Sequence, residues 1–161
     1  MSWVAMTDLS RKDRLLLSEL QRNGRITNIA LAEQIGMSPS PCLRRVRQLE
    51  EQGVIAGYTA LVDRKRVGLD ILAFVDVKVP QTPDSSIVEK FKKAVLREPA
   101  IIGCFISAGQ FDFLLKVVAR DMEAYSDLAQ NVLLKLPGVQ DMRTTFALEV
   151  VKDSPELPLG K

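Results

Sequence analysis

Three arginines and several hydroxyl and amide groups lie close together between residues 38 and 48 of this 161-residue chain. Arg44, Arg45 and Arg47 occur with no acidic residue anywhere between Ser38 and Leu49. Guanidinium groups pair with phosphates and with the acceptor edge of guanine, and hydroxyl and amide groups donate to both kinds of acceptor. We therefore interpret six residues as a candidate DNA-binding set: Ser38, Ser40, Arg44, Arg45, Arg47 and Gln48.

These side chains need a helix that presents them to a ligand. Residues 28–53 predict two short helices joined by a turn at Gly36-Met37-Ser38, with Ser38 as the N-cap of the second helix and Pro39 at its first position. Apolar residues recur at spacings of three or four in both helices: Leu31 and Ile35 in the first, and Cys42, Val46 and Leu49 in the second. This pattern is typical of a helix-turn-helix whose second helix enters the DNA major groove.

A solvated surface is the competing interpretation of the arginines, because exposed arginines are most often only that. On a helical projection the side chains of Ser40, Arg44, Arg47 and Gln48 lie opposite those of Cys42, Leu43 and Val46. The order along this face favours DNA, since the acids Glu50 and Glu51 come only at its far end. Within the set we expect two roles, with Ser38, Ser40 and Arg44 nearest the bases and Arg45, Arg47 and Gln48 at the phosphates.

A third helix is predicted before this pair, from Ser10 to about Arg22, where Asp13 completes a weak capping box with Ser10. Thr27 is the expected cap of the helix that follows. After Gly53 the β-rich segment VIAGYTALV predicts a small wing or a connecting strand, and residues 64–68 predict a linker. The bases in that linker are either a solvated hinge or additional contacts to the DNA backbone.

The periodicity changes from residue 71 onward. Alternating segments predict strands at 71–79, 101–108, 111–119 and 139–151, and amphipathic segments predict helices at 84–97 and 121–136. The order β-α-β-β-α-β is the ferredoxin-like arrangement, a four-stranded antiparallel sheet with both helices on one face. The fold class is therefore α+β, an N-terminal winged-helix-like helix-turn-helix domain followed by a ferredoxin-like domain. The predicted boundaries are a tail at 1–9, the DNA-binding domain at 10–54, a connecting strand and linker at 55–70, and the second domain at 71–161.

Composition narrows the function. Residues 1–66 hold eleven Lys and Arg against seven acids, whereas residues 67–161 hold eleven against thirteen, so the positive charge lies with the helix pair. The chain contains no histidine and only two cysteines, Cys42 and Cys104, both on apolar stripes and expected to be reduced core residues. We find no catalytic or metal-binding constellation and predict neither an enzyme nor a cofactor. No export signal or membrane span is evident, so we expect a cytoplasmic protein.

The predicted sheet has apolar residues on both faces, although helices cover only one. Phe105 beside Cys104, Phe113 beside Leu114, and Phe146 beside Ala147 place aromatic groups on alternate sides. Covering the second face with another copy would supply association free energy at about 25 cal/mol per Å² of apolar surface. We infer a sheet-to-sheet homodimer, with a heterotypic partner or a covered edge as the alternative.

These residues together resemble the Lrp/AsnC, or feast/famine, family of bacterial transcription regulators, in particular its leucine-responsive branch. The resemblance is carried in family order by DRLLLSELQRNGRITN, AEQIGMSPSPCLRRVRQLEEQGVIAGYTALVD, SAGQFDFLLKV and LLKLPGVQDMRTTFALE. It implies binding to double-stranded DNA, dimers that associate into octamers or related rings, and a small amino-acid effector held between dimers near the loop that joins the second and third strands.

The corresponding loop here is SAGQFD, and the resemblance implies an effector-binding set formed by Ser107, Gly109, Gln110, Phe111 and Asp112. The hydroxyls of Thr144 and Thr145 would also suit a zwitterionic ligand. The family pattern usually has an acid where this chain has Gln110. An amide donates to or accepts from an amino acid without neutralising its charge, so that contact is expected to be weaker.

The leading prediction is therefore a sequence-specific DNA-binding transcriptional regulator whose assembly and DNA affinity are modulated by an amino acid. The alternative is a small-molecule sensory module whose N-terminal helices bind protein partners instead of DNA. Salt dependence discriminates between them, because DNA binding releases counterions and weakens steeply as salt rises.

Overall fold

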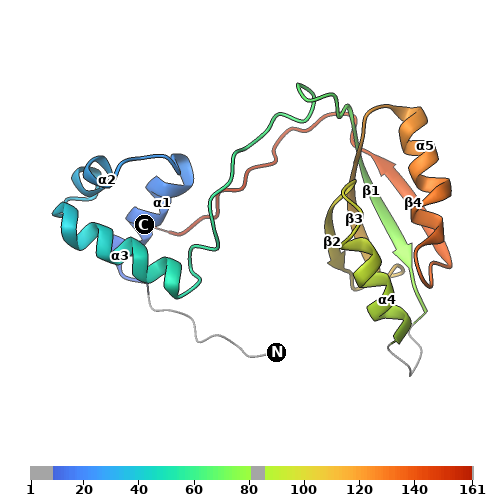
Figure 1. Cartoon of the computed structure of the whole chain (residues 1–161), viewed down its shortest axis with the longest axis horizontal. Helices are drawn as coiled ribbons and strands as arrows, with labels where there is room; N and C mark the ends of the chain where they lie inside the picture. Colours follow the sequence, from blue (N-terminus) through green and yellow to red (C-terminus); the bar gives the residue numbers. More distant parts are fainter. Residues whose placement is uncertain (1–8, 81–85, 161) are drawn as a thin grey trace. The chain divides into compact units, whose positions relative to one another are not determined.

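The computed structural model describes residues 9–80 and 86–160, so residues 1–8 of the predicted N-terminal tail lie outside the described residues. The chain divides into two compact units (Figure 1). The helical unit comprises the residues up to Leu61 together with those from Lys152 onward, and the sheet unit comprises Val62–Val151.

The helical unit contains the three predicted helices, α1 (Arg11–Arg22), α2 (Asn28–Gln34) and α3 (Pro39–Glu51). The Ser10 side chain caps α1 and forms the predicted capping box with Asp13, and Thr27 caps α2 by accepting from the Ala30 N–H. Gly36 takes the left-handed φ of 62° that the turn between α2 and α3 requires. The core of the unit consists of Leu16, Leu17, Leu31, Ala32, Ile35, Cys42 and Leu49.

Three details of this unit differ from the prediction. Residues 54–62 form no strand in the structure, because a strand needs a hydrogen-bonded neighbour and the described residues of this chain supply none here. Ser38 is the N-cap residue of α3, but its side chain makes no capping hydrogen bond. Leu43 is 40% exposed, since the buried side of α3 is centred on Cys42 and Leu49.

The sheet unit has the predicted β-α-β-β-α-β order: β1 (Ile71–Lys78), α4 (Ser86–Val95), β2 (Ile101–Ile106), β3 (Phe113–Ala119), α5 (Met122–Asn131) and β4 (Asp141–Phe146). A short 3₁₀ helix, η1 (Leu133–Lys135), follows α5. The four strands pair antiparallel in the order β2-β3-β1-β4. Of the predicted helix at 84–97, residues 84 and 85 lie outside the described residues.

One face of the sheet packs against both helices. Its core combines alternate strand residues with side chains of α4 and α5: Ala73, Val75, Val77, Leu115 and Val117 with Phe91, Val95 and Tyr125. Phe113 lies on this face with its ring centroid 4.6 Å from that of Phe91, and Phe146 packs edge-on against Tyr125. Of the three phenylalanines considered in the sequence, Phe113 therefore belongs to the core and Phe146 is partly buried against it.

The opposite face of the sheet, which we call the open face, carries Phe105 opposite Leu114, and Asp76 opposite Arg143. Phe105 is 56% exposed. The prediction of apolar groups on both faces holds, although the open face mixes them with charges. Cys104 is exposed rather than buried, because β2 is an edge strand of the sheet. Cys42 is buried as expected.

The end of the chain groups apart from the rest of the predicted second domain. The strand β4 stops at Phe146, and the residues from Lys152 onward group with the helical unit. They do so because their backbone is hydrogen-bonded by side chains of α1.

Candidate nucleic-acid interface and effector loop

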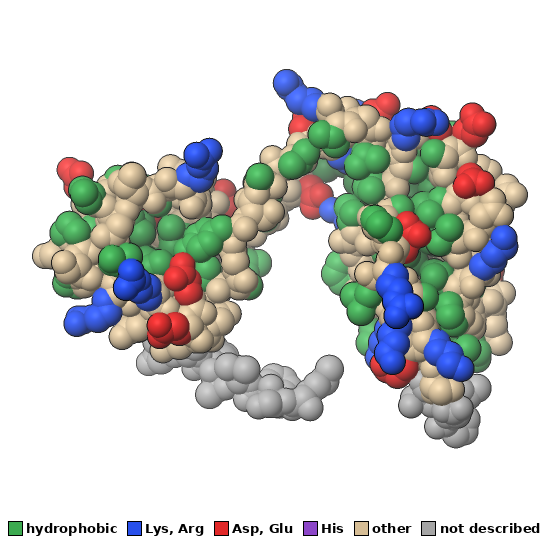
Figure 2. Space-filling view, in the orientation of Figure 1, with side chains coloured by type: hydrophobic (Ala, Val, Ile, Leu, Met, Phe, Trp, Pro, Cys, Tyr) green, Lys and Arg blue, Asp and Glu red, His purple; other side chains and the backbone are tan. Residues whose placement is uncertain are grey.

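The exposed side of α3 gathers most of the predicted DNA-binding residues. Ser40, Arg44, Arg47 and Gln48 line one shallow hollow of about 370 Å³ together with Leu43 and Glu51. All four are exposed, whereas Cys42 and Leu49 hold the other side of α3 in the core. Figure 2 shows basic side chains, in blue, over α3 and acidic side chains, in red, toward its C-terminal end. This surface offers hydrogen-bond donors, and phosphate oxygens and the acceptor atoms of base edges can accept hydrogen bonds from them.

The N-terminus of α3 is held by the preceding helix. The Asn28 side chain at the start of α2 donates from Nδ2 to the Pro39 carbonyl, over 2.8 Å. Pro39 and Pro41 have no N–H, so Ser40 supplies the only backbone donor among the first three helical positions. Ser38 is exposed immediately before them.

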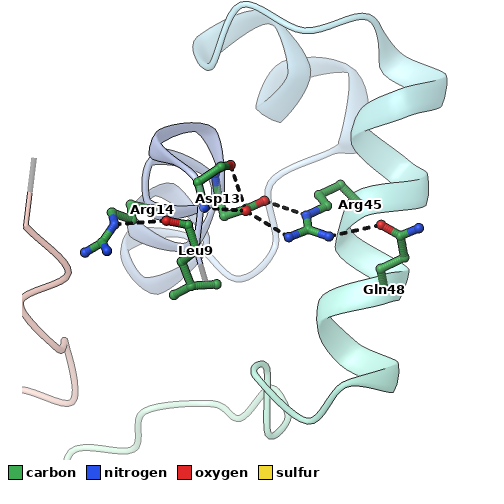
Figure 3. A network of polar contacts seen from close by, with 6 residues as sticks. Leu9, Asp13, Arg14, Arg45 and Gln48 are labelled. Atoms are coloured by element: carbon green, nitrogen blue, oxygen red, sulfur yellow. Dashed lines mark hydrogen bonds and ion pairs between the residues drawn. The ribbon is translucent and has the colours of Figure 1, made fainter. Parts of the chain in front are cut away.

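Arg45 differs from the other two arginines because its guanidinium group is engaged inside the unit (Figure 3). Its Nε and Nη2 donate to the two carboxylate oxygens of Asp13 on α1, over 2.5 and 2.8 Å, and its Nη1 donates to Gln48 Oε1 over 3.2 Å. The Asp13 side chain is 3% exposed and that of Arg45 is 28% exposed. The predicted role of Arg45 at phosphates is therefore revised: it joins α3 to α1.

The hydrogen bonds from Arg45 lower the pKa of Asp13 from 3.8 to about 2, with further help from the Ser10 hydroxyl and backbone N–H. Burial acts in the opposite direction but is outweighed. Asp13 is therefore ionised throughout the neutral range and holds Arg45 by a charge-assisted, two-point contact.

The loop between β2 and β3 contains five of the seven predicted effector-binding residues, and the other two, Thr144 and Thr145, lie on β4. Ser107, Gly109 and Gln110 are exposed. Phe111 is 8% exposed and lies beneath the guanidinium of Arg143, whose Cζ is 5.1 Å from the ring centroid. The loop therefore has exposed residues at 107, 109 and 110, and one nearly buried aromatic residue, Phe111, that is held by Arg143.

Asp112 ties this loop to β1. Its Oδ2 accepts from the Val79 N–H over 3.0 Å, its own N–H donates to the Val77 carbonyl, and its carbonyl accepts from the Ser107 N–H. These bonds give Asp112 a structural role at the base of the loop.

Thr144 and Thr145 point to opposite faces of the sheet because consecutive strand residues alternate. Thr144 lies opposite Val75 on the helix-covered face, where its hydroxyl is 2.5 Å from that of Tyr125. Thr145 lies opposite Phe74 on the open face. A single ligand is therefore not expected to contact both hydroxyls, which corrects their assignment to one set.

Comparison with known proteins identifies the family. Two family models match, a winged helix-turn-helix DNA-binding model over residues 9–56 and the Lrp/AsnC ligand binding domain over residues 72–157. The leucine-responsive regulatory protein of Escherichia coli K12 is 46% identical over 151 residues, which cover 93% of this chain and 91% of that protein. The chain belongs to the Lrp/AsnC family.

Solved structures of other regulators agree with this assignment. A transcriptional regulator from Neisseria meningitidis, solved as a complex with L-methionine, has a TM-score of 0.89 at 39% identity and covers 94% of this chain and 97% of its own. The feast or famine regulatory protein from M. tuberculosis, also complexed with L-methionine, has a TM-score of 0.83 at 30% identity and covers 92% and 98%.

This Lrp/AsnC protein is therefore a DNA-binding transcriptional regulator, as the sequence predicted. Its relatives are regulators and not enzymes, in agreement with the sequence analysis. None of the helices in the described residues is long and apolar enough to cross a membrane.

Two features of this Lrp/AsnC regulator were missed in the sequence. The first is Asp13 as the partner of Arg45. Asp13 precedes Leu16, Leu17 and Leu20 on the apolar stripe of α1, and a charge at such a position signals a buried partner. The second is Arg143, which contacts Phe111 and also donates to Asp76 Oδ2 over 2.8 Å on the open face. No local pattern distinguishes Arg143 from any other strand residue.

Proposed function

We propose that α3 is the recognition helix and that its exposed side reads the DNA major groove. Ser38, Ser40 and Arg44 lie toward the start of the helix and would face the bases, whereas Arg47 and Gln48 would contact phosphates. The observation that carries this proposal is the placement of Ser40, Arg44, Arg47 and Gln48 around one exposed hollow, while Arg45 is held by Asp13. The domain boundaries at 10–54 and 55–70 follow from the same assignment.

We also propose that an amino acid modulates DNA binding and that the 107–112 loop contributes to its site. The support is the match to a ligand-binding family model and the L-methionine complexes of two structural neighbours. The exposed Ser107, Gly109 and Gln110 would meet polar groups of the ligand. Calorimetric titration with L-methionine tests this proposal, and the absence of measurable binding would remove methionine as the effector.

We propose further that two copies form a homodimer by covering each other's open face. We also propose that such dimers associate into an octamer. The mixture of Phe105, Leu114, Asp76 and Arg143 on the open face supports an interface with both apolar and charged contacts. A regulator that acts on chromosomal DNA belongs in the bacterial cytoplasm.

The DNA proposal is tested with Arg44→Ala, measured by fluorescence anisotropy on duplexes selected from random sequence. Loss of a base-contacting arginine is expected to weaken binding about tenfold and to relax base preference at one position in each half-site. The matched control is Arg22→Ala, because Arg22 is an exposed arginine on α1 that pairs only with neighbouring Glu19 in the described contacts.

Affinity is also measured against salt concentration, where a steep decline is expected for a DNA reader. An Arg44→Ala variant with unchanged affinity and base preference would remove Arg44 from the readout. Binding that hardly responds to salt would favour the alternative, in which the helical unit docks on a protein.

A further inference from the structure

The end of the chain returns to the helical unit. The segment Lys152–Gly160, which we call the tail, follows the sheet unit in sequence but groups with α1 (Figure 1). The chain therefore passes between the two units twice, once after Leu61 and once after Val151. The first connection is the linker considered in the sequence, and the second is the tail.

Two side chains of α1 hold the tail by its backbone. Gln21 makes a reciprocal pair with Leu157, in which Nε2 donates to the Leu157 carbonyl over 3.1 Å and Oε1 accepts from its N–H over 2.7 Å. Arg14 Nη1 donates to the Leu159 carbonyl over 2.8 Å. Arg14 and Gln21 are seven residues apart, so they lie on the same side of α1 two turns from each other.

The tail has one apolar anchor. Leu159 is partly buried and packs against the core of the helical unit, whereas the side chain of Leu157 is exposed. The two leucines have the same chemistry and lie two residues apart, but only Leu159 contributes its side chain to the docking.

The prolines and the glycine of the tail favour its docked conformation. Pro155 and Pro158 restrict φ and favour an extended backbone in the free segment, which reduces the conformational entropy lost on binding. Pro155 also lines a hollow with Leu20, Gln21 and Tyr58. Gly160 has a φ of +73°, so the backbone turns directly after the Leu159 anchor.

We propose that the tail is a second tether that docks on α1 of its own helical unit and couples the sheet unit to the recognition helix. At one end it continues from β4, whose Arg143 contacts the loop residue Phe111. At the other end it holds α1, whose Asp13 fixes Arg45 of α3. The coupling half of this inference rests on the proposed DNA-reading and effector functions, whereas the docking half does not.

The contacts between the tail and α1 are weak enough for the docking to be reversible. They consist of a few largely solvent-accessible hydrogen bonds and one partly buried side chain. Segments held in this way open at low free-energy cost, so the bound and free states of the tail are both accessible. A change in the sheet unit can alter DNA binding through the tail only as far as it favours one of these states.

The docking is tested by Leu159→Ser in the full chain, with Leu157→Ser as the matched control. Hydrogen–deuterium exchange of peptides covering 153–160 and α1 is measured at several protein concentrations. The Leu159→Ser tail is expected to exchange about tenfold faster, as is that of Gln21→Ala, whereas Leu157→Ser should match the unmodified chain.

Equal exchange in the two leucine variants would overturn the docking. Tail protection that falls on dilution would assign the tail to a second copy and overturn the intramolecular tether. Leu159→Ser changes no residue of the three helices, whereas Gln21→Ala changes one residue of α1. Circular dichroism checks that the helical unit remains folded in each variant.

The coupling is tested by measuring DNA affinity of the same variants with and without L-methionine. Release of the tail is expected to change DNA affinity by roughly 2- to 30-fold and to reduce any shift that L-methionine produces, while Leu157→Ser retains both. Faster tail exchange with unchanged DNA affinity would overturn the coupling. If L-methionine has no effect on the unmodified chain, the effector proposal fails, whereas docking and coupling are still decided by exchange and by DNA affinity.

Discussion

At the level of single residues, the contact between Asp13 and Arg45 joins α1 to α3. Asp13 performs two tasks, since it completes the cap of α1 and receives both guanidinium donors of Arg45. A nearly buried carboxylate is stable only when such partners satisfy it. The pair therefore links the start of α1 to the middle of α3.

Replacement of Asp13 by Asn is expected to lower the free energy of unfolding by roughly 3 kcal/mol, because it leaves Arg45 without its counter-charge. The expected change is measured by urea denaturation followed by circular dichroism. Glu19→Gln is the control, since Glu19 pairs with Arg22 at the surface, where such contacts contribute little. Equal stability of the two variants would contradict a structural role of the buried pair.

The lowered pKa of the Asp13 carboxylate also predicts that the free energy of unfolding falls at acidic pH. The pKa of Asp13 is lowered from 3.8 to about 2 on folding, so its stabilising contribution is complete above the unfolded value and is lost as pH falls from about 4 toward 2. That contribution corresponds to roughly 2 kcal/mol. Denaturation curves between pH 2 and 5 should therefore show a flatter pH dependence for Asp13→Asn, and curves of equal slope would contradict this assignment.

At the level of elements, Gly138 controls how η1 leads into β4. Its φ is +80°, and a Cβ at this position would lie 2.7 Å from Cγ1 of Ile87 and 3.1 Å from Cγ1 of Val79. Glycine is therefore favoured here for two reasons: the backbone is left-handed, and a side chain would be too close to α4 and the end of β1.

Gly138→Ala is expected to destabilise the sheet unit by at least about 1 kcal/mol, because both the backbone and the packing oppose a side chain. Gly109→Ala is a matched control, since no atom lies within 4 Å of its Cβ position and its φ is outside the left-handed region. Thermal unfolding distinguishes the two. A Gly138→Ala protein as stable as the Gly109→Ala protein would show that Ile87 and the turn adjust without cost.

At the level of the whole molecule, the open face of the sheet is the surface that the proposed dimer would cover. Phe105 pairs with Leu114 on this face and is 56% exposed in the single chain. An aromatic residue with this exposure gives little benefit to a monomer but buries substantial apolar area in an interface.

Phe105→Glu is expected to weaken self-association at least about tenfold, because it places a charge where apolar contact is needed. Light scattering coupled to size-exclusion chromatography measures the mass across a dilution series. Met122→Glu is the control, since Met122 is 53% exposed at the start of α5 and does not belong to the open face. The same mass profile for both variants would place the interface elsewhere.

Local signals in the sequence determined much of the secondary structure of this protein. Ser10, Thr27 and the glycine at position 36 set the helix boundaries, and apolar spacing distinguished helices from strands, because caps and periodicity act between residues only a few positions apart. The exposed position of Arg44 and Arg47 also followed from this spacing. The family resemblance implied the effector loop, which no local pattern identifies.

The tertiary structure alone decided which distant residues meet. Arg45 and Asp13 are 32 positions apart, and the tail residues Leu157 and Leu159 contact α1 across 136 and 145 positions. The edge position that exposes Cys104 likewise depends on strand order and not on the residues around it. Such contacts are selected by the packing of complete elements, so the roles of Arg45 and of the tail are properties of the folded chain.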